Sequence, residues 1–163
     1  MGGRAMLDIR NDFEAAAETI QKAAAERMAE GREPGRTWTL AATSSEALLA
    51  AHPDKAEYFA IRQGPDAIGA FILTKKKTNA AWKPGPGFRY VAKLCLLAEH
   101  RGRGHADKIL GWAKAAAPYG LRLEVRAKAQ EGLRRLYRRN GFDEKGRAKD
   151  MVLLEWRRNG ADS

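Results

Sequence analysis

The stretch HRGRGHADKIL, from His100 to Leu110, restricts the fold of this chain more than any other feature of its sequence. It stands between an apolar run, FRYVAKLCLLAEH, and a segment whose apolar residues recur at helical spacing, which predicts a strand–loop–helix junction. A plain turn does not need so many basic side chains, and a solvated charge run does not need glycine. A loop that brings backbone N–H groups up to an anion needs both, because the first N–H groups of a helix lack partners within it.

Small residues in this junction leave room for an anion close to the backbone. Gly102 and Gly104 lack the Cβ atoms that would hold a phosphate away, and glycine tolerates positive φ angles. Ala106 keeps the first helical turn small, and Arg101 and Arg103 attract an anion over a longer range. The order of residues is neither a P-loop, which needs G-K-[ST], nor a dinucleotide G-x-G-x-x-G loop. The junction therefore predicts a phosphate-binding loop of another kind.

The rest of the chain supplies helices and strands in alternation. Helical spacing of apolar residues predicts helices over about 11–31, 44–52, 105–117 and 130–139. Shorter apolar or alternating runs predict strands over about 36–42, 56–63, 67–77, 88–100, 121–127 and 151–158. A GPD turn joins the second and third of these strands into a hairpin. This order predicts an α+β (mixed α/β) fold, with helices flanking a mixed sheet in a single domain over residues 1–163.

Two helices carry more detailed expectations. Asn11 followed by Glu14 predicts a capping box at the start of the first helix. Leu133, Leu136 and Tyr137 predict the inward-facing stripe of the helix that Gly141 ends.

Composition narrows the class of protein. No apolar stretch approaches the roughly 20 residues of a membrane span, and no secretory signal is visible. The single cysteine, Cys95, excludes an internal disulfide and a cysteine-based metal cluster, and the histidines have no partners at metal-ligand spacing. We therefore expect a cytoplasmic protein with no metal and no membrane attachment, present as a monomer or a homodimer.

The chain is strongly basic, with a formal net charge of +10. Its basic residues cluster in TKKKT (Lys75–Lys77), RRLYRR (Arg134–Arg139) and EWRRNG (Arg157 and Arg158). Such a surface attracts polyanions through phosphate contacts and counterion release. The charge is compatible with a nucleic-acid or ribonucleoprotein partner. The alternatives are a solvated basic face and a polyphosphate cofactor that uses part of the charge.

Two motifs, in order, resemble a known family. Arg101-x-x-Gly104-x-Ala106 is similar to the Q/R-x-x-G-x-G/A motif of the GNAT superfamily of N-acetyltransferases, and LEVRAKAQEGLRRLYRRNGF resembles the family's second motif. The residues of these motifs are most similar to those of the branch of ribosomal-protein alanine N-acetyltransferases, which acetylate protein N-termini. Gln130 stands where the family has Asn, and Leu133 where it has Ala.

The resemblance implies a coenzyme A site within a core of about residues 88–142. In the family, a strand splayed from its neighbour binds the pantetheine arm through its backbone, and the loop after it binds the pyrophosphate. The implied contacts to acetyl-CoA come from the strand residues, the loop and the next helix: Leu94, Cys95, Leu96, Arg101, Gly102, Arg103, Gly104, His105, Ala106, Asp107 and Gln130.

The resemblance also implies the catalytic residues. Tyr137 stands at the family's general-acid position, where it would protonate the leaving thiolate, and Glu124 is the implied general base. The backbone N–H of Leu96 would stabilise the oxyanion. A core aromatic is the alternative for Tyr137, and a solvated strand residue is the alternative for Glu124.

Three functions remain open from the sequence. The first is an acetyl-CoA-dependent N-acetyltransferase that acts on a protein N-terminus, a lysine or a small amine. The second is an acyltransferase whose acceptor amine is linked to nucleic acid, as in aminoacyl-tRNA or a modified base. The third is a module that binds coenzyme A without catalysis.

Overall fold

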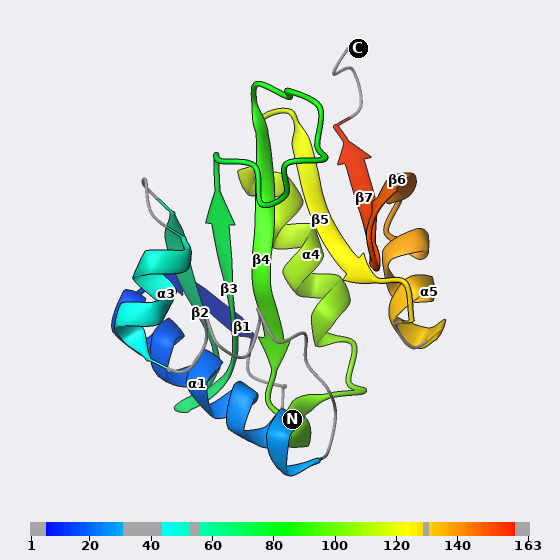
Figure 1. Ribbon diagram of the computed structural model, residues 1–163. Helices are drawn as coiled ribbons and strands as arrows, with labels where there is room; N and C mark the ends of the chain where they lie inside the picture. Colours follow the sequence, from blue (N-terminus) through cyan, green and yellow to red (C-terminus); the bar gives the residue numbers. More distant parts are fainter. Residues whose placement is uncertain (1–5, 31–43, 53–55, 129–130, 159–163) are drawn as a thin grey trace. The chain divides into compact units, whose positions relative to one another are not determined.

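Seven strands form a mixed sheet in the hydrogen-bonded order β1-β2-β3-β4-β5-β7-β6. The computed structural model describes residues 6–30, 44–52, 56–128 and 131–158 (Figure 1). The strands are β1 (Leu7–Asn11), β2 (Glu57–Gln63), β3 (Asp66–Thr74), β4 (Phe88–Leu96), β5 (Gly120–Arg126), β6 (Asp143–Ala148) and β7 (Met151–Arg157). The helices are α1 (Phe13–Ala29), α3 (Ser45–Ala51), α4 (His105–Ala116) and α5 (Glu131–Arg139), with a 3₁₀ turn, η1, at Ala98–His100. The expected α+β fold with a mixed sheet is confirmed.

The chain forms two compact units, and β4 runs from one into the other. The first unit comprises residues 1–74 and 92–103, and the second comprises residues 75–91 and 104–163. Each unit is built from segments that are far apart in the sequence.

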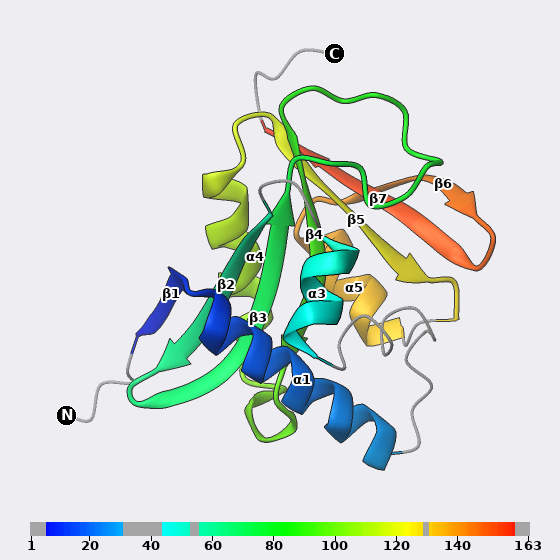
Figure 2. The ribbon, with the colours of Figure 1, turned by 60° about the vertical axis from the view of Figure 1, so that its left-hand side comes forward.

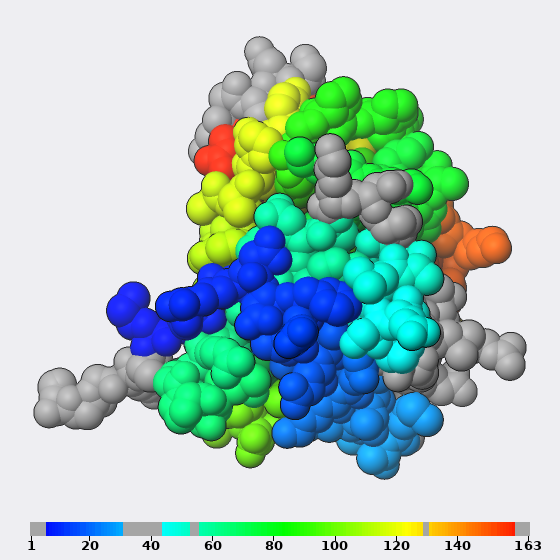
Figure 3. Space-filling view, turned by 90° about the vertical axis from the view of Figure 1, so that its left-hand side faces the viewer, coloured from blue at the N-terminus to red at the C-terminus, as the bar shows by residue number. Residues whose placement is uncertain are grey.

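In the first unit, α1 and α3 cover one face of the strands. Strands β1, β2 and β3 pair in antiparallel order, and α1 contacts β2, β3 and α3 (Figure 2). Figure 3 shows α1 in blue beside α3 in cyan on this face. The core beneath the helices is made of small and aliphatic side chains, including Ala16, Ile20, Leu48, Ile72 and Cys95.

In the second unit, β5 is the central strand. It pairs in parallel with the start of β4 and antiparallel with β7, which also pairs with β6. Leu121, Leu123 and Val125 alternate along β5 and are buried, as the sequence predicts. A second cluster gathers Trp82, Phe88, Tyr90 and Leu153.

Several local expectations need correction. The N-cap of α1 is Asp12, whose carboxylate accepts a hydrogen bond from the N–H of Ala15, so Asn11 is the last residue of β1 instead. Leu133 does not belong to an inward stripe, since 39% of it is exposed, whereas Tyr137 is buried. Strands β1 and β6 were not expected. In β1 only two apolar residues, Leu7 and Ile9, alternate with polar ones, and β6 (DEKGRA) carries no apolar alternation. The strand expected over 36–42 lies outside the described residues.

Candidate functional site: a glycine loop and a carboxylate on β5

The predicted phosphate loop has the backbone geometry that its glycines suggest. Gly102 and Gly104 adopt φ angles of +75° and +79°, and a Cβ atom built on either would meet nothing within 4 Å. Gly104 is also the N-cap of α4, where it contributes no side-chain hydrogen bond. The first N–H groups of α4 therefore receive no acceptor from a capping side chain, which suits a bound anion.

Arg101 ties the start of this loop to the rest of the first unit. Its Nε donates to the backbone oxygen of Leu96 at 3.2 Å, and its guanidinium lies 3.5 Å from Glu30 and 4.0 Å from Glu26. Glu26 also accepts a hydrogen bond of 2.9 Å from the N–H of Ala98. Arg101 thus anchors the loop, whereas Arg103 is exposed.

Asp107, in the first turn of α4, is joined to the end of α5. Its carboxylate accepts two hydrogen bonds from Arg139, at 3.0 and 2.7 Å, and one of 2.9 Å from Asn140. The bonds from Arg139 and Asn140 lower the pKa of Asp107 to about 2. Because Arg139 balances this negative charge, Asp107 repels a phosphate at the helix N-terminus less than an unpaired carboxylate would.

The backbone of β4 is irregular immediately before the predicted pantetheine-binding residues. Lys93 has a φ of +54°, an uncommon conformation for a non-glycine residue. Beyond it, Cys95 is buried in the core of the first unit, and Leu94 and Leu96 are half-buried. Burial raises the pKa of the Cys95 thiol to about 11. Since successive side chains of a strand alternate, Leu94 and Leu96 share the opposite face from Cys95.

The neighbours of β4 differ along its length. Gly69 of β3 lies so close to it that an added Cβ would approach the backbone oxygen of Cys95 to 2.5 Å. The register of β4 with β5 covers only Phe88 to Tyr90, although β5 continues to Arg126. Among the described residues, no pairing between these strands follows Tyr90, so the later backbone groups of β5 on that side have no strand partner from β4.

Glu124 projects from β5 toward the loop of residues 75–87. Its Oε2 accepts a hydrogen bond from the hydroxyl of Thr78 and one of 3.1 Å from the indole Nε1 of Trp82. The side chain is half-buried. The carboxylate is thus held by two donors on one oxygen, and the side chain keeps part of its surface exposed.

Arg122, two residues earlier on the same face of β5, binds the same loop through a hydrogen bond to its backbone. It is buried, and its Nε donates to Glu155 at 2.8 Å. Its Nη1 donates to the backbone oxygen of Lys83 at 2.7 Å and to the hydroxyl of Tyr90 at 2.8 Å. The guanidinium also stacks on Phe88, with its carbon 4.1 Å from the ring centroid. The loop and β5 thus form one connected polar and aromatic cluster.

The remaining predicted residues lie on α4 and α5. Tyr137 is 6% exposed, and its ring meets that of Phe142 edge-on at 5.6 Å. His105, the first residue of α4, is 5% exposed, and Ala106 follows it. Gln130 lies outside the described residues.

Sequence reasoning missed Thr78, Lys93 and Arg122. A threonine in a loop and a lysine in a strand carry no local signal of these contacts. Arg122 does carry a local signal, because it stands between two core leucines and on the same face of the strand as Glu124.

These features define a class of protein. A mixed sheet whose parallel β4–β5 pair stops after three residues, followed by a glycine loop that opens a helix, is the arrangement that the resemblance to the GNAT superfamily implies. The profile of the Acetyltransferase (GNAT) family matches residues 9–142, and the chain belongs to this family.

Solved structures with the same fold cover nearly the whole chain. The PaiA N-acetyltransferase of Thermoplasma acidophilum, solved in complex with coenzyme A, has a TM-score of 0.62 and 18% identity, and 94% of this chain and 99% of that one are covered. The IAA acetyltransferase of Bacillus cereus has a TM-score of 0.63 and 16% identity, and 94% of this chain and 100% of that one are covered. The GNAT domain of PAT from S. lividans has a TM-score of 0.63 and 18% identity, and 96% of this chain and 92% of that one are covered. A search of curated sequences gave no match.

Other kinds of site find no support in the described part of the chain. There, no three histidine, cysteine, aspartate or glutamate side chains gather in a way that could hold a metal ion. None of the described helices has both the length and the apolar character of a membrane span.

Proposed function

We propose that this protein transfers the acetyl group of acetyl-CoA to a primary amine, with Glu124 as the general base and Tyr137 as the general acid. The observation that carries the proposal is the Glu124 carboxylate, half-buried beside the loop of residues 75–87 and oriented by two hydrogen bonds. An amine that is protonated at neutral pH must lose a proton before it can attack a thioester, and a positioned carboxylate accepts that proton directly or through a water molecule.

Acetyl-CoA supplies an acetyl thioester, so the reaction forms a C–N bond and breaks a C–S bond. The residues around Gly102 and Gly104 and the N–H groups of α4 would bind the pyrophosphate, while the backbone of Leu94 to Leu96 would bind the pantetheine arm. The N–H of Leu96 would stabilise the developing oxyanion.

Proton transfers complete the balance. Glu124 takes one proton from the ammonium group of the acceptor and passes it to solvent, and solvent takes the second as the amide forms. Tyr137 gives its phenolic proton to the departing thiolate and regains a proton from solvent. The net change is one amide, one free thiol of coenzyme A and one released proton.

The test is mass spectrometry of acceptor pools after incubation with isotope-labelled acetyl-CoA. The pools are peptides with free N-termini, lysine and small amines, and bulk tRNA. We expect labelled acetyl groups on nitrogen in one pool, and a much weaker signal with Glu124→Gln and Tyr137→Phe. If no pool is labelled although the protein binds coenzyme A, the non-catalytic binding module replaces this proposal.

A second candidate, an acceptor amine carried on nucleic acid, is favoured by the distribution of charge. The second unit holds 19 lysines and arginines against 8 acidic residues, a net charge of +11, whereas the first unit holds 11 against 12. The loop of residues 75–87, whose side chains bind Glu124, contains four lysines and no acidic residue. Labelling of tRNA in preference to peptides would support this candidate.

A further inference from the structure

Glu124 receives both of its described hydrogen bonds on the same oxygen. The hydroxyl of Thr78 and the indole N–H of Trp82 both donate to Oε2, the latter over 3.1 Å. A carboxylate oxygen offers about two acceptor sites, so these donors occupy Oε2 fully. They also fix the plane of the carboxylate, since rotation about its last torsion would break both bonds.

Trp82 is itself held firmly. Its side chain is 4% exposed, its ring meets Tyr90 edge-on at 6.1 Å, and the Arg122 guanidinium lies 4.6 Å from its centroid. The Nζ of Lys77 donates to its backbone oxygen at 3.1 Å. The indole donor thus belongs to a packed core, and does not depend on a freely moving loop.

Thr78 occupies a less constrained position. It is half-buried and lies on the same loop, four residues before Trp82. Its hydroxyl reaches Glu124 across 46 residues of sequence. The two donors therefore approach the carboxylate from one segment that is far from β5 along the chain.

We infer that Thr78 and Trp82 are positioning residues, which hold Glu124 so that its Oε1 faces the acceptor amine. This inference rests on the proposed role of Glu124 as the base. With Oε2 saturated, the proton of the acceptor has one oxygen to reach, at a fixed orientation. The charged groups nearest along β5 are Arg122, which is paired with Glu155, and Arg126.

The first experiment tests the hydrogen bond without any acceptor. Each tryptophan gives one indole signal in a ¹H–¹⁵N correlation spectrum, and the Trp82 signal is assigned by its loss in Trp82→Phe. We expect this signal to move in Glu124→Gln, where a neutral amide replaces the carboxylate, and to move less in Thr78→Val. An unchanged Trp82 signal in Glu124→Gln would overturn the inference.

The second experiment tests the role in the reaction, with a short peptide that has a free amino terminus as the probe. Thr78→Val keeps the shape of the side chain but removes the hydroxyl, and Thr78→Ser retains it. We expect Thr78→Val to lower kcat by about ten-fold, a fraction of the roughly 10²–10⁴-fold that a general base contributes. The KM for acetyl-CoA should stay constant, and Thr78→Ser should restore kcat. Trp82→Phe, which keeps a packed ring, is the second variant should Thr78→Val fold poorly.

A double-mutant cycle separates positioning from stability. If Thr78 acts through Glu124, Thr78→Val should cause no further loss in a Glu124→Gln background. An equal loss in both backgrounds would show a merely structural role and overturn the inference. If Glu124→Gln abolishes turnover while Thr78→Val leaves it intact, only this inference fails. If Glu124→Gln keeps full turnover, the proposed base fails, and the inference fails with it.

Discussion

A single substitution, Tyr137→Phe, distinguishes the proposed catalytic role of Tyr137 from its role in packing. Its ring is buried against Phe142, and Tyr137→Phe keeps that ring while it removes the hydroxyl. We expect normal folding and coenzyme affinity, with turnover lowered by roughly ten- to ten-thousand-fold, the effect of losing a general acid. Single-turnover kinetics and calorimetry with coenzyme A measure the two quantities. Full turnover under conditions where chemistry limits the rate would make Tyr137 only a core aromatic.

Arg122 and Arg157 bind the same carboxylate in different surroundings. Arg122 is 6% exposed and pairs with Glu155 at 2.8 Å, whereas Arg157 is 40% exposed and pairs with it at 3.0 Å. Removing one partner of a buried pair costs about 3–5 kcal/mol, while an exposed pair contributes about 1 kcal/mol or less. Urea denaturation should therefore show a large loss of unfolding free energy for Arg122→Ala and a small one for Arg157→Ala. Equal losses would contradict the burial difference.

At the scale of single elements, the N-terminus of α4 offers a matched pair of glycines. Gly104 and Gly64 both have positive φ angles, +79° and +60°, and open space around an added Cβ. Gly64 lies in the turn between β2 and β3 and is not part of the predicted phosphate loop. A non-glycine residue in this conformation costs about 1–2 kcal/mol, so Gly104→Ala and Gly64→Ala should destabilise the protein similarly.

Of these two variants, only Gly104→Ala should weaken the binding of coenzyme A. A Cβ at position 104 would occupy the space in which we place the pyrophosphate, so calorimetry should show weaker coenzyme A binding for Gly104→Ala and unchanged binding for Gly64→Ala. The larger Gly104→Val should weaken it further. Unchanged affinity in a folded Gly104→Val protein would remove the loop from the coenzyme site.

The link between α4 and α5 makes stability depend on pH. The pKa of Asp107 falls from 3.8 to about 2 because Arg139 and Asn140 bind the ionised form. A lowered pKa in the folded state contributes stability above pH 4 that is lost as the pH falls toward 2. Since 38% of the Asp107 side chain is exposed, we expect no more than about 1 kcal/mol. The difference in unfolding free energy between the parent and Asp107→Asn should shrink from pH 6 to pH 2, and a constant difference would contradict the link.

The sequence predicted most of the elements but few of their contacts. Helices α3 and α4 and strands β2 to β5 follow from apolar spacing and from glycine and proline at their ends, which are local signals. Strand β6 was missed because it lies at the edge of the sheet and carries no apolar face, and β1 was missed because its alternation is limited to Leu7 and Ile9. The bonds from Thr78 and Trp82 to Glu124 escaped because they join residues more than 40 positions apart, and no local pattern encodes such a contact.

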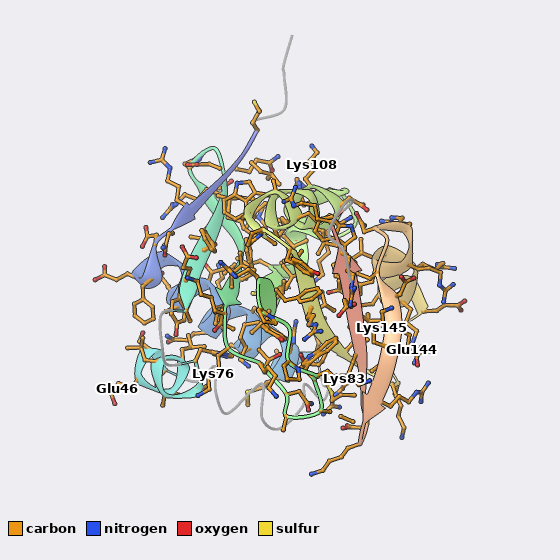
Figure 4. All side chains as sticks on the ribbon, turned by 90° about the horizontal axis from the view of Figure 1, so that it is seen from above. Glu46, Lys76, Lys83, Lys108, Glu144 and Lys145 are labelled. Atoms are coloured by element: carbon orange, nitrogen blue, oxygen red, sulfur yellow. The ribbon has the colours of Figure 1, made fainter. Side chains whose placement is uncertain are left out.

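At the scale of the whole molecule, many of the basic residues in the second unit have structural partners. Arg134 donates to the backbone oxygen of Ala127, Arg139 binds Asp107, and Arg158 donates to carbonyl oxygens at the end of α4. Lys83, Lys108 and Lys145, which Figure 4 labels, are exposed. A test of polyanion binding must therefore avoid the arginines that hold the fold.

Arg135 and Arg138, exposed on α5, are suitable residues for that test. If a nucleic acid binds the second unit, Arg135→Gln combined with Arg138→Gln should weaken tRNA binding and reduce its salt dependence by about two phosphate contacts. The control removes the same charge from the first unit, with Arg10→Gln and Lys22→Gln. Equal salt slopes for both double variants would favour a peptide or small-amine acceptor.

The burial of Cys95 decides how the reaction can be followed. Each turnover releases the thiol of coenzyme A, and the chain contains a single cysteine, which is 4% exposed with its pKa raised to about 11. Because the thiolate is the species that reacts, a chromogenic thiol reagent should detect the product while the folded protein stays silent. One equivalent of reactive thiol per chain, appearing without acetyl-CoA, would then report unfolding of the first unit. The same reagent therefore measures both turnover and the loss of folded protein.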